Sequence, residues 1–158
     1  MPDRRAAASV RNKSHVLFAV AIVVVLVFLA MLRPVDHDES QYVAAASLTA
    51  RGLMPYRDYA YLQTPLQPFL LAPLVRAAGE WAWPALRIAN ALFAAVAVIA
   101  VGGAAQAAGA HRRMALAASA LFATTDILLF SAGTARNDAL PAAPVSYTHL
   151  TLPTILRV

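Results

Sequence analysis

An acidic segment follows the first long apolar run of the chain, where the chain would leave a membrane. Three carboxylates and a histidine fall within seven residues, which read Asp36-His37-Asp38-Glu39-Ser40-Gln41-Tyr42. Ionisable side chains are costly at the mouth of a membrane helix and commonly mark functional sites. The segment therefore predicts a site that acts on a molecule arriving through the bilayer.

Simpler roles for these residues stay open. Asp38 precedes a helix expected to begin at Glu39, and Gln41 three residues later fits a capping-box spacing. The 36–38 segment has metal-ligand residue types, but three consecutive residues rarely converge on one ion. A solvated loop is therefore the favoured alternative, and no metal site is predicted.

Three apolar segments predict membrane helices. The first, Val16–Leu32, has 17 residues without charge or proline, and a helix of this length rises about 25 Å. The others are Ile88–Ala110 and Met114–Ala135, the latter with the single charge Asp126. With 60% hydrophobic and 13% charged residues, the composition favours an all-α polytopic membrane protein with three transmembrane helices. The alternatives are a soluble helical domain with a buried Ala-rich hairpin and, for residues 1–32, a signal peptide.

The charges predict topology. Basic residues precede the first segment and lie between the second and third: Arg4, Arg5, Arg11, Lys13, Arg112 and Arg113. The 33–87 loop is balanced, with five acids and five arginines. By the positive-inside pattern, residues 1–15 are a cytoplasmic tail and the 33–87 loop is external. The net charge of +5 thus reflects topology and does not indicate a nucleic-acid partner. We expect a multi-pass protein of the bacterial inner (plasma) membrane, with the bilayer as its partner.

The external loop is expected to carry short interfacial helices. A helix from Glu39 would stop at Gly52, and an aromatic, polar stretch over 55–65 would lie at the headgroups. Residues 65–75 are apolar but rich in proline, which predicts an interfacial or re-entrant segment. The sequence contains no cysteine, which excludes disulfides and thiolate metal sites.

The last residues differ in character from the rest. Residues 145–158 are threonine-rich, lack a helical period and closely resemble a translated sequencing-adapter tail. We therefore expect a non-native tail over 145–158 and a truncated transmembrane domain over 16–144. A natural disordered tail is the alternative.

The ordered polar motifs resemble a known enzyme family. The motifs are Asp38-Glu39-Ser40-Gln41-Tyr42, Arg51-Gly52, Pro55-Tyr56-Arg57-Asp58, Pro65-Leu66 and Ala135-Arg136-Asn137-Asp138. In this order they are similar to the first external loop and second polar motif of GT-C glycosyltransferases. The nearest group is that of the dolichyl-phosphate-mannose protein mannosyltransferases and 4-amino-arabinose lipid A transferases. The resemblance covers roughly residues 15–140.

The resemblance implies transfer of a sugar from a polyprenyl-phosphate donor to an acceptor on the external face. It makes Asp38 the catalytic base and gives Glu39 an orienting role toward the acceptor or a cation. The substrate-binding residues that it implies are Tyr42, Arg57, Asp58, Arg136 and Asp138. It leaves the cofactor open. A three-helix fragment is expected to be inactive by itself.

Duller alternatives accompany these roles. Arg57 with Asp58 would be a surface ion pair, and Arg136 would extend to the headgroups. Asp126 lies 12 residues before Asp138, about 18 Å along a straight helix, so they cannot share a site unless the helix breaks. For the whole chain, the alternative is a non-catalytic polytopic protein or a transporter fragment whose acids line a pathway.

The topology can be tested by single-cysteine labelling, since the chain has no native cysteine. With an impermeant reagent we expect Ser40→Cys to be labelled from the external side and Ser14→Cys to be protected. Labelling of Ser14→Cys alone would overturn this topology.

Overall fold

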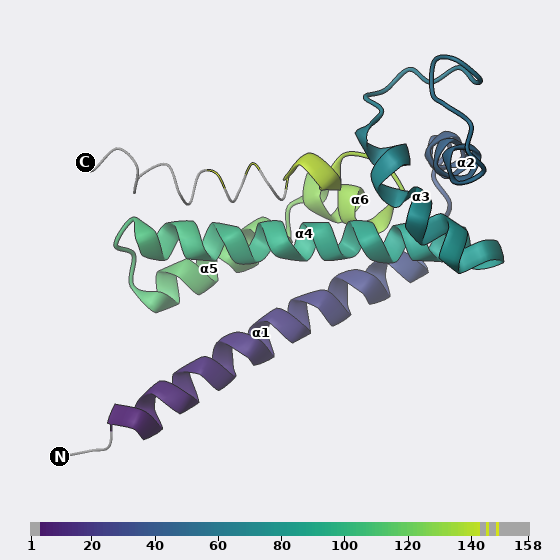
Figure 1. Ribbon diagram of the computed structural model, residues 1–158. Coiled ribbons are helices and arrows are strands. Elements are labelled where there is room, and N and C mark those ends of the chain that lie inside the picture. Colours follow the sequence, from purple (N-terminus) through teal and green to yellow (C-terminus); the bar gives the residue numbers. More distant parts are fainter. Residues whose placement is uncertain (1–3, 143–144, 146–147, 149–158) are drawn as a thin grey trace.

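The computed structural model describes residues 4–142, 145 and 148, with side chains from Val16 onward (Figure 1). This part of the chain is helical and contains no strand, which confirms the all-α class. The elements are α1 Arg4–Leu32, α2 Glu39–Ala50, α3 Leu66–Ala78, η1 Gly79–Trp81, α4 Ala82–Ala107, α5 Arg112–Ala123 and α6 Asp126–Gly133. Apart from residues 145 and 148, the expected non-native tail lies outside the described residues.

Helix α4 is the central element of the fold. It contacts α1, α3, α5 and α6, and in Figure 1 it lies between α1 on one side and α6 on the other. The core at this junction is built mostly from small side chains: Ala30, Ala91, Ala94, Ala95, Val98, Leu128, Ala132 and Leu26. Alanine at spacings of three and four lets helix backbones approach closely, as in packed membrane helices. The alanines of α4 thus form the surface against which the neighbouring helices pack.

The α4–α5 contact depends on a glycine. A Cβ atom at Gly102 would lie 2.4 Å from Oγ of Ser119, whose hydroxyl donates to the carbonyl of Val98 at 3.0 Å. The absent side chain therefore leaves room for a hydrogen bond between neighbouring helices.

Helix α2 begins and ends where the sequence predicts, but its first turn is not capped by Asp38. Gly52 adopts φ +91°, and Leu53 N donates to Leu48 O at 3.1 Å, which is the Schellman stop. Asp38 occupies the N-cap position in helical conformation without a side-chain capping bond. Its carboxylate is used elsewhere, and the capping interpretation is wrong.

The aromatic stretch between α2 and α3 is hydrogen-bonded to both helices. Tyr59 Oη donates to Ala45 O at 3.1 Å, and Tyr61 Oη donates to Oε1 of Gln67 at 3.2 Å. Tyr61 is buried, whereas Tyr56 is 60% exposed. The exposed ring of Tyr56 is therefore able to contact lipid headgroups, whereas the ring of Tyr61 packs inside the protein. The segment predicted as interfacial or re-entrant forms α3.

In the part of the chain that the structure describes, one helical stretch alone is clearly long enough to span a membrane. Among the described residues, Leu66–Ala107, which contains α3, η1 and α4, is long and apolar enough to cross a membrane. Val16–Leu32 is a shorter apolar helix. Helices α5 and α6 pass only as a pair bent by 63°, a broken span or a re-entrant loop. The three predicted spans are thus not all established.

The third predicted span is not a single helix. It breaks between Ala123 and Asp126, where Thr124 Oγ1 donates to Leu121 O at 2.9 Å and Thr125 Oγ1 to Phe122 O at 2.8 Å. Asp126 therefore lies in the exposed first turn of α6, where the helix dipole favours an acid, rather than in the middle of a helix.

Gly102→Ala should lower the free energy of unfolding by about 1–3 kcal/mol, because the new methyl group overlaps the Ser119 hydroxyl. Removing that hydroxyl relieves the overlap, so Gly102→Ala should cost less in a Ser119→Ala background than in the wild type. Thermal unfolding in detergent, followed by circular dichroism, measures both effects. Equal costs in both backgrounds would contradict this account of the contact.

Candidate functional site

A buried ion pair connects the acidic segment to α4. The carboxylate of Glu39 in α2 and the guanidinium of Arg87 in α4 form two hydrogen bonds, Nε to Oε1 at 2.9 Å and Nη2 to Oε2 at 2.7 Å. Their side chains are 0% and 6% exposed. Because both charges are removed from water, the pair is tolerable only with its remaining donors and acceptors satisfied.

Backbone carbonyls satisfy the rest of Arg87. Its Nη1 donates to Ala30 O at 2.8 Å and to Arg33 O at 2.7 Å, and its Nη2 donates to Pro34 O at 3.0 Å. The last carbonyls of a helix have no partner within the helix. Arg87 thus terminates α1 and fixes the chain that leads to the acidic segment.

Backbone amides satisfy the rest of Glu39. Its Oε2 accepts from Asp36 N at 3.1 Å, and its Oε1 accepts from Ala135 N. These amides belong to segments almost one hundred residues apart. Glu39 therefore joins the segment after α1 to the segment after α6.

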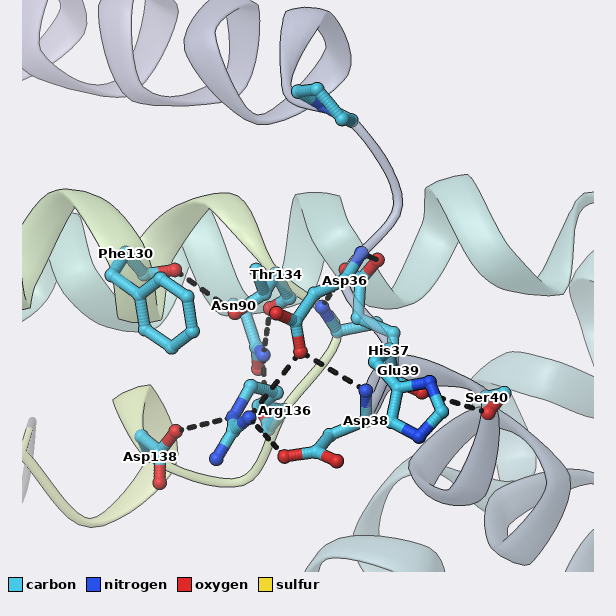
Figure 2. Close-up of polar contacts among 12 residues, drawn as sticks. Asp36, His37, Asp38, Glu39, Ser40, Asn90, Phe130, Thr134, Arg136 and Asp138 are labelled. Atoms are coloured by element: carbon cyan, nitrogen blue, oxygen red, sulfur yellow. Dashed lines mark hydrogen bonds and ion pairs between the residues drawn. The ribbon is translucent and has the colours of Figure 1, made fainter.

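Arg136 lies among three aspartates at this junction (Figure 2). Its Nη1 is 2.6 Å from Oδ2 of Asp38 and 3.3 Å from Oδ1 of Asp36, and its Nε is 2.9 Å from Oδ2 of Asp138. The Arg136 side chain is 20% exposed, and those of Asp38 and Asp138 are 44% and 42% exposed. We call these four residues the Arg136 cluster. One cation and three carboxylates give it a net charge of −2.

Aromatic rings complete the surroundings of Arg136. Its guanidinium carbon lies 5.7 Å from the ring centroid of Tyr42 and 5.3 Å from that of Phe130. Burial opposes the charged form of Arg136, but hydrogen bonds and charge from Asp138 and Asp38 raise its pKa overall. Burial also raises the pKa of Tyr42, against the opposing charge of Arg136, so its hydroxyl stays protonated at neutral pH.

Asn90 of α4 holds the backbone that carries Arg136. Its side-chain amide nitrogen donates to Thr134 O at 2.6 Å and to the carbonyl of Arg136 itself. Asn90 is 1% exposed and lies one helical turn beyond Arg87. The two polar residues of this face of α4 thus position both segments of the site.

An apolar groove adjoins the cluster. It has a volume of about 540 Å³ and is lined chiefly by apolar side chains, among them Phe122, Ile127, Leu128 and Phe130. Arg136 and Asp138 also line it. A second groove of about 580 Å³ lies between α2 and α3, and no member of the Arg136 cluster lines it. Of these two grooves, the one beside α6 is the one that joins apolar surface to members of the Arg136 cluster.

The structure brings together five of the seven predicted site residues: Asp38, Glu39, Tyr42, Arg136 and Asp138. Arg57 and Asp58 are not among them. Their exposed ion pair of 2.7 Å lies in the loop before α3, where Asp58 Oδ2 also accepts from Met54 N. The Arg57 and Met54 hydrogen bonds lower the pKa of Asp58 to about 2. Arg57 and Asp58 thus form a surface ion pair, which is the alternative stated for them, and the turn contact to Met54 N is made by Asp58 alone.

Arg87 and Asn90 were not among the predicted site residues. Sequence reasoning counted Arg87 as the last charge of the external loop, whereas it lies inside α4. A usable signal existed, because two polar residues three apart lie in the first half of α4, in a sequence that is otherwise apolar as far as Gln106. Comparison of the chain with protein-family models, curated proteins and solved structures found no match.

Arg87→Met should lower the free energy of unfolding by about 3–5 kcal/mol, because it leaves the Glu39 carboxylate buried without its partner. The double variant Glu39→Gln/Arg87→Met should lose less than the two single losses combined. Thermal unfolding in detergent measures both. Arg57→Met, which removes an exposed guanidinium, is the matched control and should leave stability unchanged. A wild-type transition in Arg87→Met would refute the structural role of the pair.

Proposed function

We propose that the chain is the donor-binding part of an integral-membrane glycosyltransferase that moves a sugar from a polyprenyl-phosphate donor to an acceptor on the external face. The observation that carries the proposal is the groove beside α6, which Arg136 and Asp138 line together with apolar side chains. A lipid-linked sugar requires an apolar surface for its chain and charged groups at its reacting end. The groove offers both.

Asp38 is the proposed general base. Its side chain is 44% exposed, so an acceptor hydroxyl can approach, and it lies 2.6 Å from Arg136. The acceptor hydroxyl gives its proton to Asp38 while its oxygen bonds to the anomeric carbon of the sugar. The bond from that carbon to the phosphate oxygen breaks, and the polyprenyl phosphate leaves with the electron pair.

Glu39 has no part in this chemistry. Both of its oxygens already accept hydrogen bonds, from Arg87 and from two backbone amides, and the side chain is fully buried. Of the two acids for which the resemblance implies a role at the reaction, Asp38 alone keeps that role in this proposal. Glu39 acts as a positioning residue for the segments on either side.

The bilayer is the proposed environment of α1 and α4. Large apolar side chains on the outer faces of both helices are exposed, including Val24, Phe28, Leu92, Val96 and Ile99. Exposed apolar patches on this scale mark membrane or protein contacts. With hydrocarbon against these helices, the segment after Leu32 reaches the headgroup region, where a lipid phosphate lies.

Asp38→Asn should reduce sugar transfer by about 10²- to 10⁴-fold in the enzyme that contains these residues, because an amide cannot accept the acceptor's proton. Donor binding and folding should be retained, since the amide keeps the size of the side chain. Release of polyprenyl phosphate from a labelled donor measures turnover. Glu80→Gln, which neutralises an exposed acid of the same loop, should transfer at the wild-type rate. Full activity of Asp38→Asn would remove Asp38 from the mechanism.

A further inference from the structure

Arg33, directly after α1, supplies a second guanidinium beside Arg136. Its guanidinium carbon lies 4.8 Å from the ring centroid of Phe130, and that of Arg136 lies 5.3 Å from the same centroid. Phe130 is also a lining residue of the groove beside α6. Two cations therefore flank one aromatic ring where apolar surface and charge meet.

The backbone of α6 admits Arg33 to this position. A Cβ atom at Gly133 would lie 2.8 Å from Cδ and 3.5 Å from Nη1 of Arg33. Nη1 donates to the carbonyl of Leu129 at 3.3 Å. A residue with a side chain at position 133 would push Arg33 off the Phe130 ring, so its placement depends on this glycine.

The two arginines differ in their charge balance. Arg136 faces three carboxylates, so a phosphate that approached it would also approach the net negative charge of the Arg136 cluster. Arg33 has no carboxylate partner within the described part of the chain, and its one side-chain hydrogen bond there goes to Leu129 O. Because a guanidinium has five N–H donors, most of its donors and its full charge remain for an anion.

We infer that Arg33 binds the phosphate of a lipid-linked donor whose chain lies in the groove beside α6, while Arg136 orders the carboxylates. The inference rests on the proposed function and places the phosphate site of that function on Arg33 rather than on Arg136. The planar fork of Arg33 matches two phosphate oxygens, a geometry that lysine lacks. Arg33 directly follows the last residue of α1, which suits a group at headgroup depth.

A purely structural role makes a different prediction. If Arg33 only satisfied a carbonyl near the end of α6, its loss would affect stability without distinguishing a charged lipid from an uncharged one. Binding of matched lipids to the whole 158-residue chain in phosphatidylcholine nanodiscs separates the two roles. The probes are undecaprenyl phosphate, undecaprenol, which lacks the phosphate, and inorganic phosphate, which lacks the chain.

The wild type should bind undecaprenyl phosphate more tightly than undecaprenol. Arg33→Gln should weaken binding of undecaprenyl phosphate by about ten- to hundredfold and leave that of undecaprenol unchanged. Arg51→Gln, the same substitution at an exposed arginine after α2, should bind both lipids as the wild type does. Inorganic phosphate should compete only weakly, because it cannot use the groove.

Each of these binding measurements can overturn a specific part of the inference or of the proposed function. Wild-type affinity of Arg33→Gln for undecaprenyl phosphate, or an equal loss for both lipids, would overturn the role of Arg33 and leave the proposed function standing. A wild type without preference for the phosphorylated lipid would contradict the proposed function itself. Inorganic phosphate binding as tightly as the lipid would assign Arg33 to a free anion and overturn the lipid part. If Arg33→Gln does not fold, Arg33→Lys tests the fork, and its unchanged affinity would overturn the inference.

Discussion

The buried contact between Glu39 and Arg87 is the constraint on which the rest of this structure depends. A buried carboxylate and guanidinium are stable only when nearly all of their hydrogen-bonding capacity is used. Arg87 meets this requirement with one carbonyl in the last turn of α1 and two just after it, and Glu39 with the amides of Asp36 and Ala135. Satisfying the pair therefore brings α1, α2, α4 and the segment after α6 to one point.

The same constraint separates two neighbouring acids. Successive residues of a helix point about 100° apart, so Asp38 and Glu39 at the start of α2 face different surroundings. Glu39 turns into the core, whereas Asp38 remains 44% exposed beside Arg136. The side chain whose hydrogen bonds are all made fixes the geometry, and the accessible one is the side chain proposed as the general base.

The break between α5 and α6 has a comparable consequence for the apolar surface. Phe122 lies before the bend of 63° and Ile127 after it, yet both line the groove that reaches Arg136. A straight helix would present residues five apart on nearly opposite faces. The hydroxyls of Thr124 and Thr125 donate hydrogen bonds to carbonyls of the preceding turn. Because these carbonyls are satisfied, the break costs less free energy in apolar surroundings.

The sequence by itself determined the helical class, the start of α2 at Glu39 and its stop at Gly52. It also singled out Asp38 and Arg136 as candidate site residues. These are local properties, since apolar runs, a left-handed glycine and charges at segment ends act through near neighbours along the chain. Only the tertiary structure decided that Glu39 pairs with Arg87, because the 33–87 loop offers five arginines and charge alone does not choose among them. It likewise left Arg57 in an exposed turn and placed Arg33 on Phe130. Which side chains meet depends on which helix faces pack, and the alanine and glycine contacts along α4 and α6 set that over distances that local patterns do not report.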